Sequence, residues 1–233
     1  MHMNDMNIVA IITDYHISIT AFLLFGVLHS FCAQEAFKNW LAGWAGLFFV
    51  EHFWRLIYCA ISYVSLYQVI SIFHWGLHPD ANVWLINYPD WLWRVIVVLH
   101  LSSIALIYTA FLQSDYLEFW GVKQAWLGAR ILRGKVPAGS GIVLFGTHRL
   151  VVDGLYCWIR HPMLIGGFLF LITSGPSRNN IIFLFMYTLY MILGAYYEER
   201  RLIRIFGEEY RGYRRQVGAF IPKGIPRPIQ RDR

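Results

Sequence analysis

The densest group of polar and aromatic side chains in this chain is residues 148–162, His-Arg-Leu-Val-Val-Asp-Gly-Leu-Tyr-Cys-Trp-Ile-Arg-His-Pro. Arginine, histidine and tyrosine side chains can bind anions, exchange protons or pack on a flat ligand. An apolar run follows directly, and Pro162 suits the first turn of a helix, where its missing N–H costs nothing. The segment has two interpretations: a ligand site, or a basic anchor at a membrane surface.

A second polar cluster closes the last apolar run of the chain. Glu198 and Glu199 stand there, directly before Arg200 and Arg201. Carboxylates at a helix end commonly pair with nearby arginines, so a surface ion pair is a sufficient explanation for Glu199. Glu198 is the better binding candidate, provided that it faces the first cluster.

Histidines inside apolar runs are polar groups that are costly there and usually face other helices. Two of them are His29, which is followed by Ser30, and His100. Each can act in chemistry or simply hydrogen-bond a neighbouring helix. The nine histidines show no HExxH pattern and the three cysteines no CxxC, so we expect neither a metal site nor a disulfide framework.

The elements that must position these groups are membrane helices. Of the 233 residues, 57% are hydrophobic and 15% are charged, against about 25% charged in soluble proteins, which excludes an ordinary soluble enzyme. Apolar runs near residues 8–30, 47–73, 91–113, 162–174 and 180–197 predict an all-α integral membrane protein with about five transmembrane helices. Because the fourth run is short, the last two can also form a tight helical hairpin.

The distribution of basic residues predicts the orientation. Residues 74–90 contain no Lys or Arg, whereas 114–149 contain five. The positive-inside rule then places 114–149 and the C-terminus in the cytoplasm and the N-terminus outside. Ten of the 20 basic residues lie from Arg200 onward, directly after an apolar helix, which favours contact with membrane lipid over nucleic acid.

The two polar clusters, taken in order, resemble a known superfamily. His148-x-Leu-Val-x-x-Gly-x-Tyr-x-x-x-Arg-His-Pro162, an apolar hairpin, Glu-Glu-x-x-Leu and Phe-Gly-Glu-Glu-Tyr-x-x-Tyr-x-x-x-Val217 are similar to the isoprenylcysteine carboxyl methyltransferase and phospholipid methyltransferase superfamily. This resemblance covers about 148–222. A looser similarity upstream, in Leu-His29-Ser30, Phe37-Lys-x-Trp40 and residues 120–135, resembles its methanethiol S-methyltransferase and NnrU-like branch.

The resemblance implies one methyltransferase-like domain over 1–233. It would comprise three spans in 1–113, a cytoplasmic interfacial segment in 114–153, and a cofactor-binding hairpin with a C-terminal helix in 154–222, forming a cytoplasmic cap. The implied cofactor is S-adenosylmethionine, and the residues implied to bind it are His148, Leu150, Val151, Tyr156, His161, Pro162, Glu198 and Glu199. The catalytic candidates are His29, Arg160 and His161, because a neighbouring cation or histidine favours the thiolate form of a thiol.

Two departures from the superfamily pattern restrict the chemical class of the methyl acceptor. Leu164 stands where tyrosine is usual, which removes a hydroxyl, and Gly194 stands where the carboxyl methyltransferases carry an arginine for the substrate carboxylate. A buried carboxylate without a guanidinium is costly, so methylation of a carboxyl group is disfavoured. We therefore predict a bacterial inner-membrane enzyme that methylates a small lipophilic thiol such as methanethiol, giving dimethyl sulfide.

Three alternatives remain open. The acceptor can be another lipophilic molecule. Membrane reductases of related architecture use NADPH without a GxGxxG motif, so its absence here does not separate the two classes. A non-enzymatic accessory protein of the NnrU-like branch would bind neither ligand.

Overall fold

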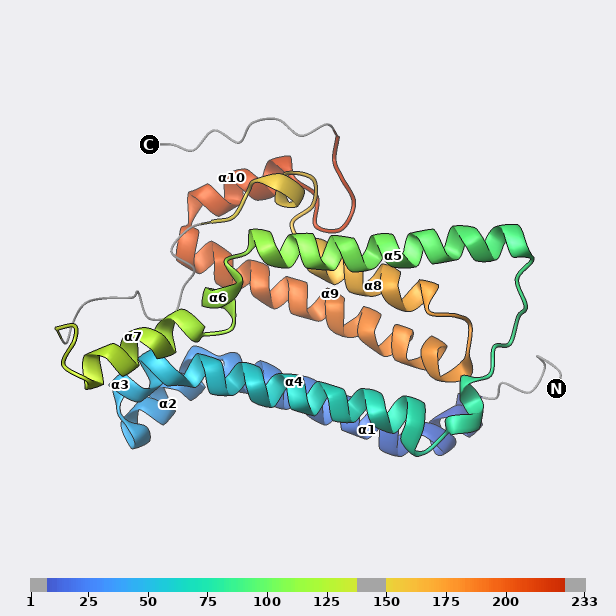
Figure 1. Cartoon of the computed structure of the whole chain (residues 1–233), viewed down its shortest axis with the longest axis horizontal. Coiled ribbons are helices and arrows are strands. Elements are labelled where there is room, and N and C mark those ends of the chain that lie inside the picture. The colour runs from blue at the N-terminus through green and yellow to red at the C-terminus, as the bar shows by residue number, and fades with distance from the viewer. Residues whose placement is uncertain (1–7, 138–149, 225–233) are drawn as a thin grey trace.

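The computed structural model describes residues 8–137 and 150–224, which are helical apart from connecting segments (Figure 1). The helices are α1 (Ile8–Ala33), α2 (Glu35–Ala45), α3 (Leu47–Phe49), α4 (Arg55–Ser71), α5 (Asp90–Gln113), α6 (Tyr116–Phe119), α7 (Val122–Leu132), α8 (Pro162–Thr173), α9 (Arg178–Phe206) and α10 (Glu208–Gln216). Wider π-helical turns at Val50–Trp54 and Ile72–Gly76 join α3 to α4 and extend α4, and short 3₁₀ turns cover Pro79–Asn82 and Gly154–Cys157. Strand-like pairing within the described residues is limited to isolated bridges.

Four stretches are long and apolar enough to cross a membrane: Val9–Ala33, Leu47–Gly76, Asp90–Gln113 and Arg178–Phe206. The prediction of an all-α integral membrane protein is thereby confirmed. The fourth predicted span is α8, whose 12 residues measure about 18 Å, less than the roughly 30 Å of a bilayer core. It forms the predicted hairpin with α9, and α9 runs nine residues beyond the predicted end.

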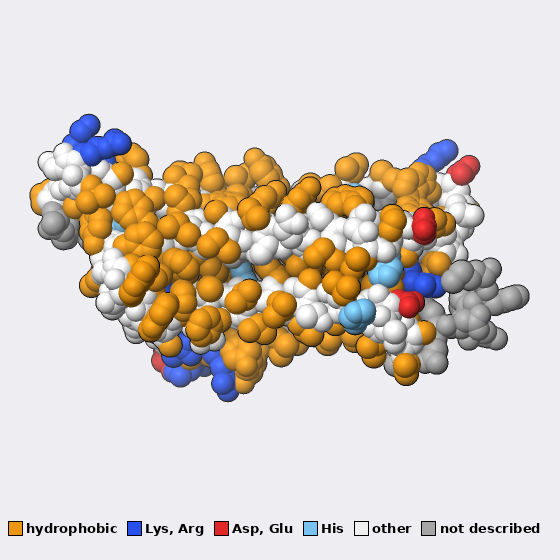
Figure 2. Space-filling model, turned by 90° about the horizontal axis from the view of Figure 1, so that it is seen from below, with side chains coloured by type: hydrophobic (Ala, Val, Ile, Leu, Met, Phe, Trp, Pro, Cys, Tyr) orange, Lys and Arg blue, Asp and Glu red, His pale blue; other side chains and the backbone are white. Residues whose placement is uncertain are grey.

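The surface agrees with a membrane environment. On the face seen in Figure 2, hydrophobic side chains form a broad band between charged groups near the two ends of the molecule. In Figure 1, α1 begins at the end of the bundle opposite α10, and α9 runs toward the end where α2 and α7 lie.

Packing between helices creates two sides of the bundle. On one side α1 and α4 lie against α9 through a core cluster formed by Tyr15, Phe22, Phe25, Val69, Phe73, Phe183 and Met186. On the other side α5 and α8 approach closely at Gly166, where a Cβ would lie 2.6 Å from Cγ1 of Ile107. Long α9 touches both sides, so residues on its different faces belong to different environments.

The predicted interfacial segment, 114–153, begins with two short helices. Its two helices, α6 and α7, meet at Gly121, which has a φ of +78°. A Cβ at this glycine would lie 2.5 Å from the backbone nitrogen of Leu56, so only glycine lets the turn approach α4. The turn therefore fixes α6 and α7 against the beginning of α4.

The C-terminal layer, defined here as residues 150–161 and 207–224, covers one end of α8 and α9. Its hydrophobic core consists of Leu150, Val152, Tyr210, Tyr213 and Val217. The chain after α10 pairs with the segment before α8, where the Arg160 and His161 amides donate to the carbonyls of Gly218 (2.9 Å) and Ala219 (3.2 Å). The predicted cytoplasmic, cofactor-binding cap would include these residues, and the cap stays a prediction.

Candidate active site

The centre of the polar network is the carboxylate of Glu199, which is only 8% exposed. Its Oε1 accepts hydrogen bonds from Nε of Arg160 at 2.8 Å and from Nη2 of the same guanidinium. Its Oε2 lies 3.1 Å from Nε of Arg214, and Nε2 of His161 lies 3.3 Å from Oε1. Such a buried carboxylate is tolerated because several cationic donors surround it.

The guanidinium of Arg160 makes hydrogen bonds through Nε, Nη1 and Nη2. Besides its two bonds to Glu199, Nη1 donates to the carbonyl oxygens of Val217 and Arg214, the latter at 3.2 Å. The guanidinium thus ties the segment before α8, helix α9 and the end of α10 together. This arrangement favours a positioning role for Arg160; the catalytic role predicted for it stays a prediction.

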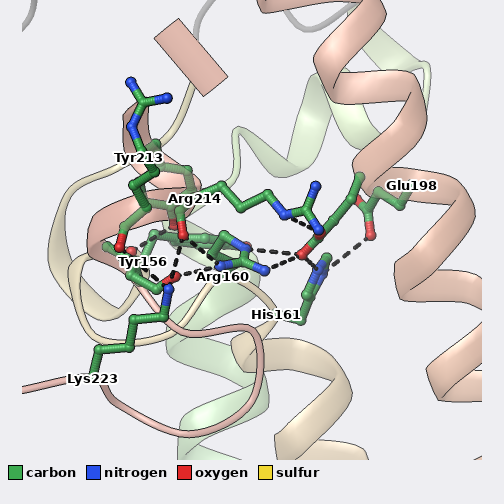
Figure 3. A network of polar contacts seen from close by, with 10 residues as sticks. Tyr156, Arg160, His161, Glu198, Tyr213, Arg214 and Lys223 are labelled. Atoms are coloured by element: carbon green, nitrogen blue, oxygen red, sulfur yellow. Dashed lines mark hydrogen bonds and ion pairs between the residues drawn. The ribbon is translucent and has the colours of Figure 1, made fainter. Parts of the chain in front are cut away.

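Glu198 differs sharply from its neighbour. Successive residues on a helix point about 100° apart, so Glu198 turns away from the Arg160 pair and toward Nδ1 of His161, at 3.4 Å (Figure 3). Its side chain is 56% exposed. His161 is buried, and its ring lies between the two carboxylates. Glu199 is fully engaged by cationic side chains of the protein, whereas the carboxylate of Glu198 is open to solvent.

Tyr156 belongs to the same polar network, on the side opposite Glu198 in Figure 3. Burial, and then the nearby charge of Glu198, raise the pKa of Tyr156 to about 12, so its phenol stays protonated at neutral pH. Its hydroxyl donates to the carbonyl of Ala110 at 3.4 Å, and its own carbonyl accepts a 2.6 Å hydrogen bond from the Tyr213 hydroxyl. α5 and α10 together fix the position of Tyr156.

The turn before Tyr156 depends on a glycine. Gly154 has a φ of +63°, and a Cβ there would lie 2.4 Å from the side chain of Gln113. The side-chain Oε1 of Gln113 in turn accepts a hydrogen bond from the backbone amide of Leu155 at 2.9 Å. The end of α5 therefore sets the path of the chain into the site.

His29 lies in a separate polar cluster, between α1, α4 and α9. Its Nδ1 is 2.9 Å from Oγ of Ser62, and its Nε2 is 2.9 Å from the Tyr58 hydroxyl. Its ring faces Tyr190 at 6.5 Å between centroids. Tyr190 is eight residues before Glu198 on α9, about 12 Å along the helix axis. Both ring nitrogens have hydroxyl partners, and the predicted catalytic role stays a prediction.

His100 hydrogen-bonds a neighbouring helix, which is the simpler of the two interpretations given for it. Its Nδ1 lies 2.9 Å from Oγ1 of Thr173 on α8. Within residues 8–137 and 150–224, no group of three or more His, Cys, Asp and Glu side chains is placed to hold a metal ion.

Five of the predicted site residues thus come together in one network: Tyr156, Arg160, His161, Glu198 and Glu199. Three others, Leu150, Val151 and Pro162, lie on the segments that lead into it, and His148 falls outside the described residues. The sequence interpretation missed Arg214 and Tyr213. An indication was available for Tyr213, because Tyr210 and Tyr213 share one face of a short helix that must pack on something.

Comparisons with known proteins agree with the sequence resemblance. The family model described as NnrU protein matches residues 17–217. Methanethiol S-methyltransferase of Pseudomonas deceptionensis is 31% identical over 216 residues, covering 90% of this chain and 73% of that protein. Methanethiol S-methyltransferase 1 of Bradyrhizobium diazoefficiens is 28% identical, covering 88% of this chain and 66% of that protein.

A more distant relative matches a shorter part of the chain. Protein-S-isoprenylcysteine O-methyltransferase of Schizosaccharomyces pombe is 32% identical over 85 residues, which is 34% of each chain. No solved structure matches.

Proposed function

Because this chain belongs to the NnrU family and is similar to curated methanethiol S-methyltransferases along most of its length, we propose that it is an S-adenosylmethionine-dependent membrane methyltransferase. Its proposed acceptor is a small lipophilic thiol such as methanethiol, which would become dimethyl sulfide. The observation that carries the proposal is the open carboxylate of Glu198 beside a network in which Glu199 is already neutralised.

The residues around Glu198 fit the proposed cofactor. S-adenosylmethionine carries an ammonium group, two ribose hydroxyls and a sulfonium, and it supplies a methyl group that a nucleophile can take. A half-exposed carboxylate can accept hydrogen bonds from the ammonium or the hydroxyls. The protonated Tyr156 and the main chain at Leu150 and Val151 supply further polar and apolar contacts.

In this proposal His161 is a cofactor-binding residue that also holds Glu198 in place. Arg160 and Glu199 position His161 through their buried ion pair, and Pro162 starts α8 immediately after it. His148 would complete the set. The contribution of these residues to catalysis is orientation and exclusion of water, which suits a displacement that needs no strong acid.

Gly194 supports a small acceptor. It lies one turn before Glu198 on α9, and a Cβ built on it meets no atom within 4 Å. Space beside the proposed cofactor site is therefore available, without a guanidinium to pair a carboxylate. His29 lies further along the same side of α9, and we propose that it borders the acceptor.

We also propose that the protein lies in the bacterial inner membrane with its C-terminal layer in the cytoplasm. S-adenosylmethionine is a charged, water-soluble molecule, so its site is expected on an aqueous face. The basic residues of 114–149 favour the cytoplasmic side for that face.

Calorimetric titration of the detergent-purified protein with S-adenosylhomocysteine, with NADPH in parallel, tests the proposed function. We expect binding of the first ligand alone, and at least a 10-fold weaker affinity in Glu198→Gln, because a charge-assisted hydrogen bond contributes about 1.5–3 kcal/mol. Glu208→Gln is the matched control, since that exposed carboxylate pairs with Arg211 on α10.

Each other outcome assigns a different class. Binding of NADPH alone would identify a reductase, and failure of folded protein to bind either ligand would favour an accessory protein. If S-adenosylhomocysteine binds, a screen of thiols and other lipophilic acceptors by product mass identifies the substrate. A product other than a thioether would refute the thiol assignment.

A further inference from the structure

A phenylalanine beside the proposed cofactor site belongs to neither hydrophobic core cluster of the described residues. Phe220 follows α10, is partly buried, and faces the imidazole of His161 with ring centroids 5.7 Å apart and planes inclined at 42°. The clusters that form the cores of the bundle and of the C-terminal layer do not include it. The sequence resemblance covers this residue but gives it no role, and the network around Glu199 does not use it. Core packing therefore does not explain an aromatic side chain at this position.

Backbone pairing holds Phe220 beside His161. Residues 217–223, called the return segment here, leave the end of α10 and pair with the chain that leads into α8. The amide of His161 donates to the carbonyl of Ala219 at 3.2 Å, and the amide before it donates to the carbonyl of Gly218 at 2.9 Å. Because Phe220 directly follows a paired residue, the main chain sets its place beside the imidazole.

The turn and the far end of the return segment are fixed as well. A Cβ at Gly218 would lie 1.8 Å from the carbonyl oxygen of Ile221, so only glycine lets the segment fold back at this point. The ammonium of Lys223 donates to the carbonyls of Arg214 and Arg215, both at 3.2 Å, in the last turn of α10, where carbonyls lack helical partners. The return segment is therefore closed at both ends, which positions its aromatic side chain before any ligand binds.

His161 connects Phe220 with the open carboxylate of Glu198. The Nδ1 atom of the buried imidazole lies 3.4 Å from Oε2 of Glu198, and the same imidazole faces the ring of Phe220. The phenyl ring and the carboxylate are thus separated by no more than one imidazole and its two contacts. A nucleoside can bridge such a separation, because a single sugar ring joins its base to its hydroxyls.

An aromatic face near a carboxylate suits one part of S-adenosylmethionine in particular. Adenine is the only flat aromatic group of this molecule, and bases of every kind stack on aromatic side chains. The ribose hydroxyls next to it can donate hydrogen bonds to a carboxylate. The competing occupant is the positive sulfonium, because a cation is also attracted to the face of an aromatic ring. S-adenosylhomocysteine distinguishes the two occupants, because it keeps the adenine and lacks the charge on sulfur.

We propose that the ring of Phe220 binds the adenine of S-adenosylmethionine and that the return segment forms this wall of the cofactor site, with Glu198 accepting hydrogen bonds from the ribose hydroxyls. The inference rests on the proposed function and adds a binding residue that the sequence resemblance does not assign. Phe220 makes and breaks no bond. Its substitution should therefore change the affinity for the cofactor and leave the rate of methyl transfer at saturating cofactor nearly unchanged.

The first test locates the adenine on the wild-type chain and does not depend on turnover. S-adenosylhomocysteine that carries a photoreactive azide on its adenine is bound to the detergent-purified protein and irradiated, and the protein is digested with trypsin. Arg215 and Lys223 define a short tryptic peptide, residues 216–223, that contains Phe220. We expect the label in this peptide, and an excess of unlabelled S-adenosylhomocysteine should abolish it. Label confined to other peptides would place the adenine elsewhere and overturn the inference.

The second test is calorimetric titration of Phe220 variants with S-adenosylmethionine, S-adenosylhomocysteine and 5′-methylthioadenosine, all of which contain adenine. Leucine keeps apolar volume but has no aromatic face, so Phe220→Leu should weaken the binding of each ligand by a similar factor, about 5- to 100-fold. Phe220→Trp should restore most of the affinity. In turnover with methanethiol, Phe220→Leu should raise the KM for S-adenosylmethionine and leave kcat within about 2-fold. Ile221→Leu is the matched control, because that neighbouring side chain is 78% exposed.

Several binding results would overturn the inference. A loss for S-adenosylmethionine but not for S-adenosylhomocysteine would assign the ring to the sulfonium. An equal loss in Ile221→Leu, or a failure of Phe220→Trp to restore binding together with a lowered midpoint of thermal unfolding, would indicate a structural role. Unchanged affinity in Phe220→Leu would refute the adenine contact alone and leave the proposed function standing. If the folded wild-type protein binds no S-adenosylhomocysteine, the proposed function fails and the adenine contact fails with it.

Discussion

Two adjacent carboxylates on α9 illustrate how the environment separates residues of the same type. Glu199 is buried and engages Arg160, Arg214 and His161, so its charge is already balanced inside the protein. Glu198 is half-exposed and touches His161 alone among the ionic contacts of the described residues. The first carboxylate stabilises the C-terminal layer, and the second is available to a ligand.

Substitution of these two glutamates should therefore have opposite consequences for stability and binding. Glu199→Gln leaves Arg160 buried without its charge partner, and we expect a loss of about 3 kcal/mol in the free energy of unfolding. Glu198→Gln should leave stability within about 0.5 kcal/mol. The midpoint of thermal unfolding in detergent, followed by tryptophan fluorescence, measures both. Equal destabilisation by the two variants would contradict the assignment.

At the scale of elements, α9 is the helix that brings the site together. One face carries Met191, Ala195 and Glu199 into the protein, and another carries Tyr190 toward α1. A helix of 29 residues can contact both sides of the bundle and still reach the C-terminal layer. The proposed cofactor and acceptor sites lie next to each other because both use this one helix.

Two glycines on neighbouring helices should respond differently to alanine. At Gly166 of α8 the new methyl group would lie 2.6 Å from Cγ1 and 3.3 Å from the backbone nitrogen of Ile107, so α5 and α8 must shift. We expect Gly166→Ala to cost about 1–3 kcal/mol. Gly194→Ala meets no atom within 4 Å and should stabilise α9 by about 0.5–1 kcal/mol. The midpoint of thermal unfolding of each variant measures these changes. An unchanged midpoint in Gly166→Ala would refute the close packing of α5 against α8.

At the scale of the whole molecule, the bundle separates a basic end from a loop without basic residues. α2, α7 and the C-terminal layer lie toward one end, and residues 74–90, which contain no Lys or Arg, connect the helices at the other. This polarity is the physical basis for the proposed orientation.

Reporter fusions in a bacterial host test that orientation. A green fluorescent protein fused after residue 233 should fluoresce, because it folds in the cytoplasm. Alkaline phosphatase fused after residue 86 should be active, because it requires the oxidising periplasm. The reverse pattern would place the proposed cofactor site on the wrong side for S-adenosylmethionine, and the topology would have to be inverted.

The sequence by itself determined the class of protein and the five apolar helices, because an apolar run of suitable length forms a helix in lipid whatever its partners are. It also placed Tyr156, Arg160, His161, Glu198 and Glu199 in two clusters, since the resemblance preserves their order. The bend at Gly121 and the extension of α9 past residue 197 depend on contacts with other segments, so periodicity alone missed them.

Only the tertiary structure decided how these groups are distributed in space. Which glutamate is neutralised depends on the rotation of α9 relative to Arg160, 39 residues away along the chain. The separation of His29 from Glu198 depends on where helices distant in the sequence cross. Residue types and local spacing predict elements, but they carry no information on the angles and contacts between elements, and those contacts set the geometry of the site.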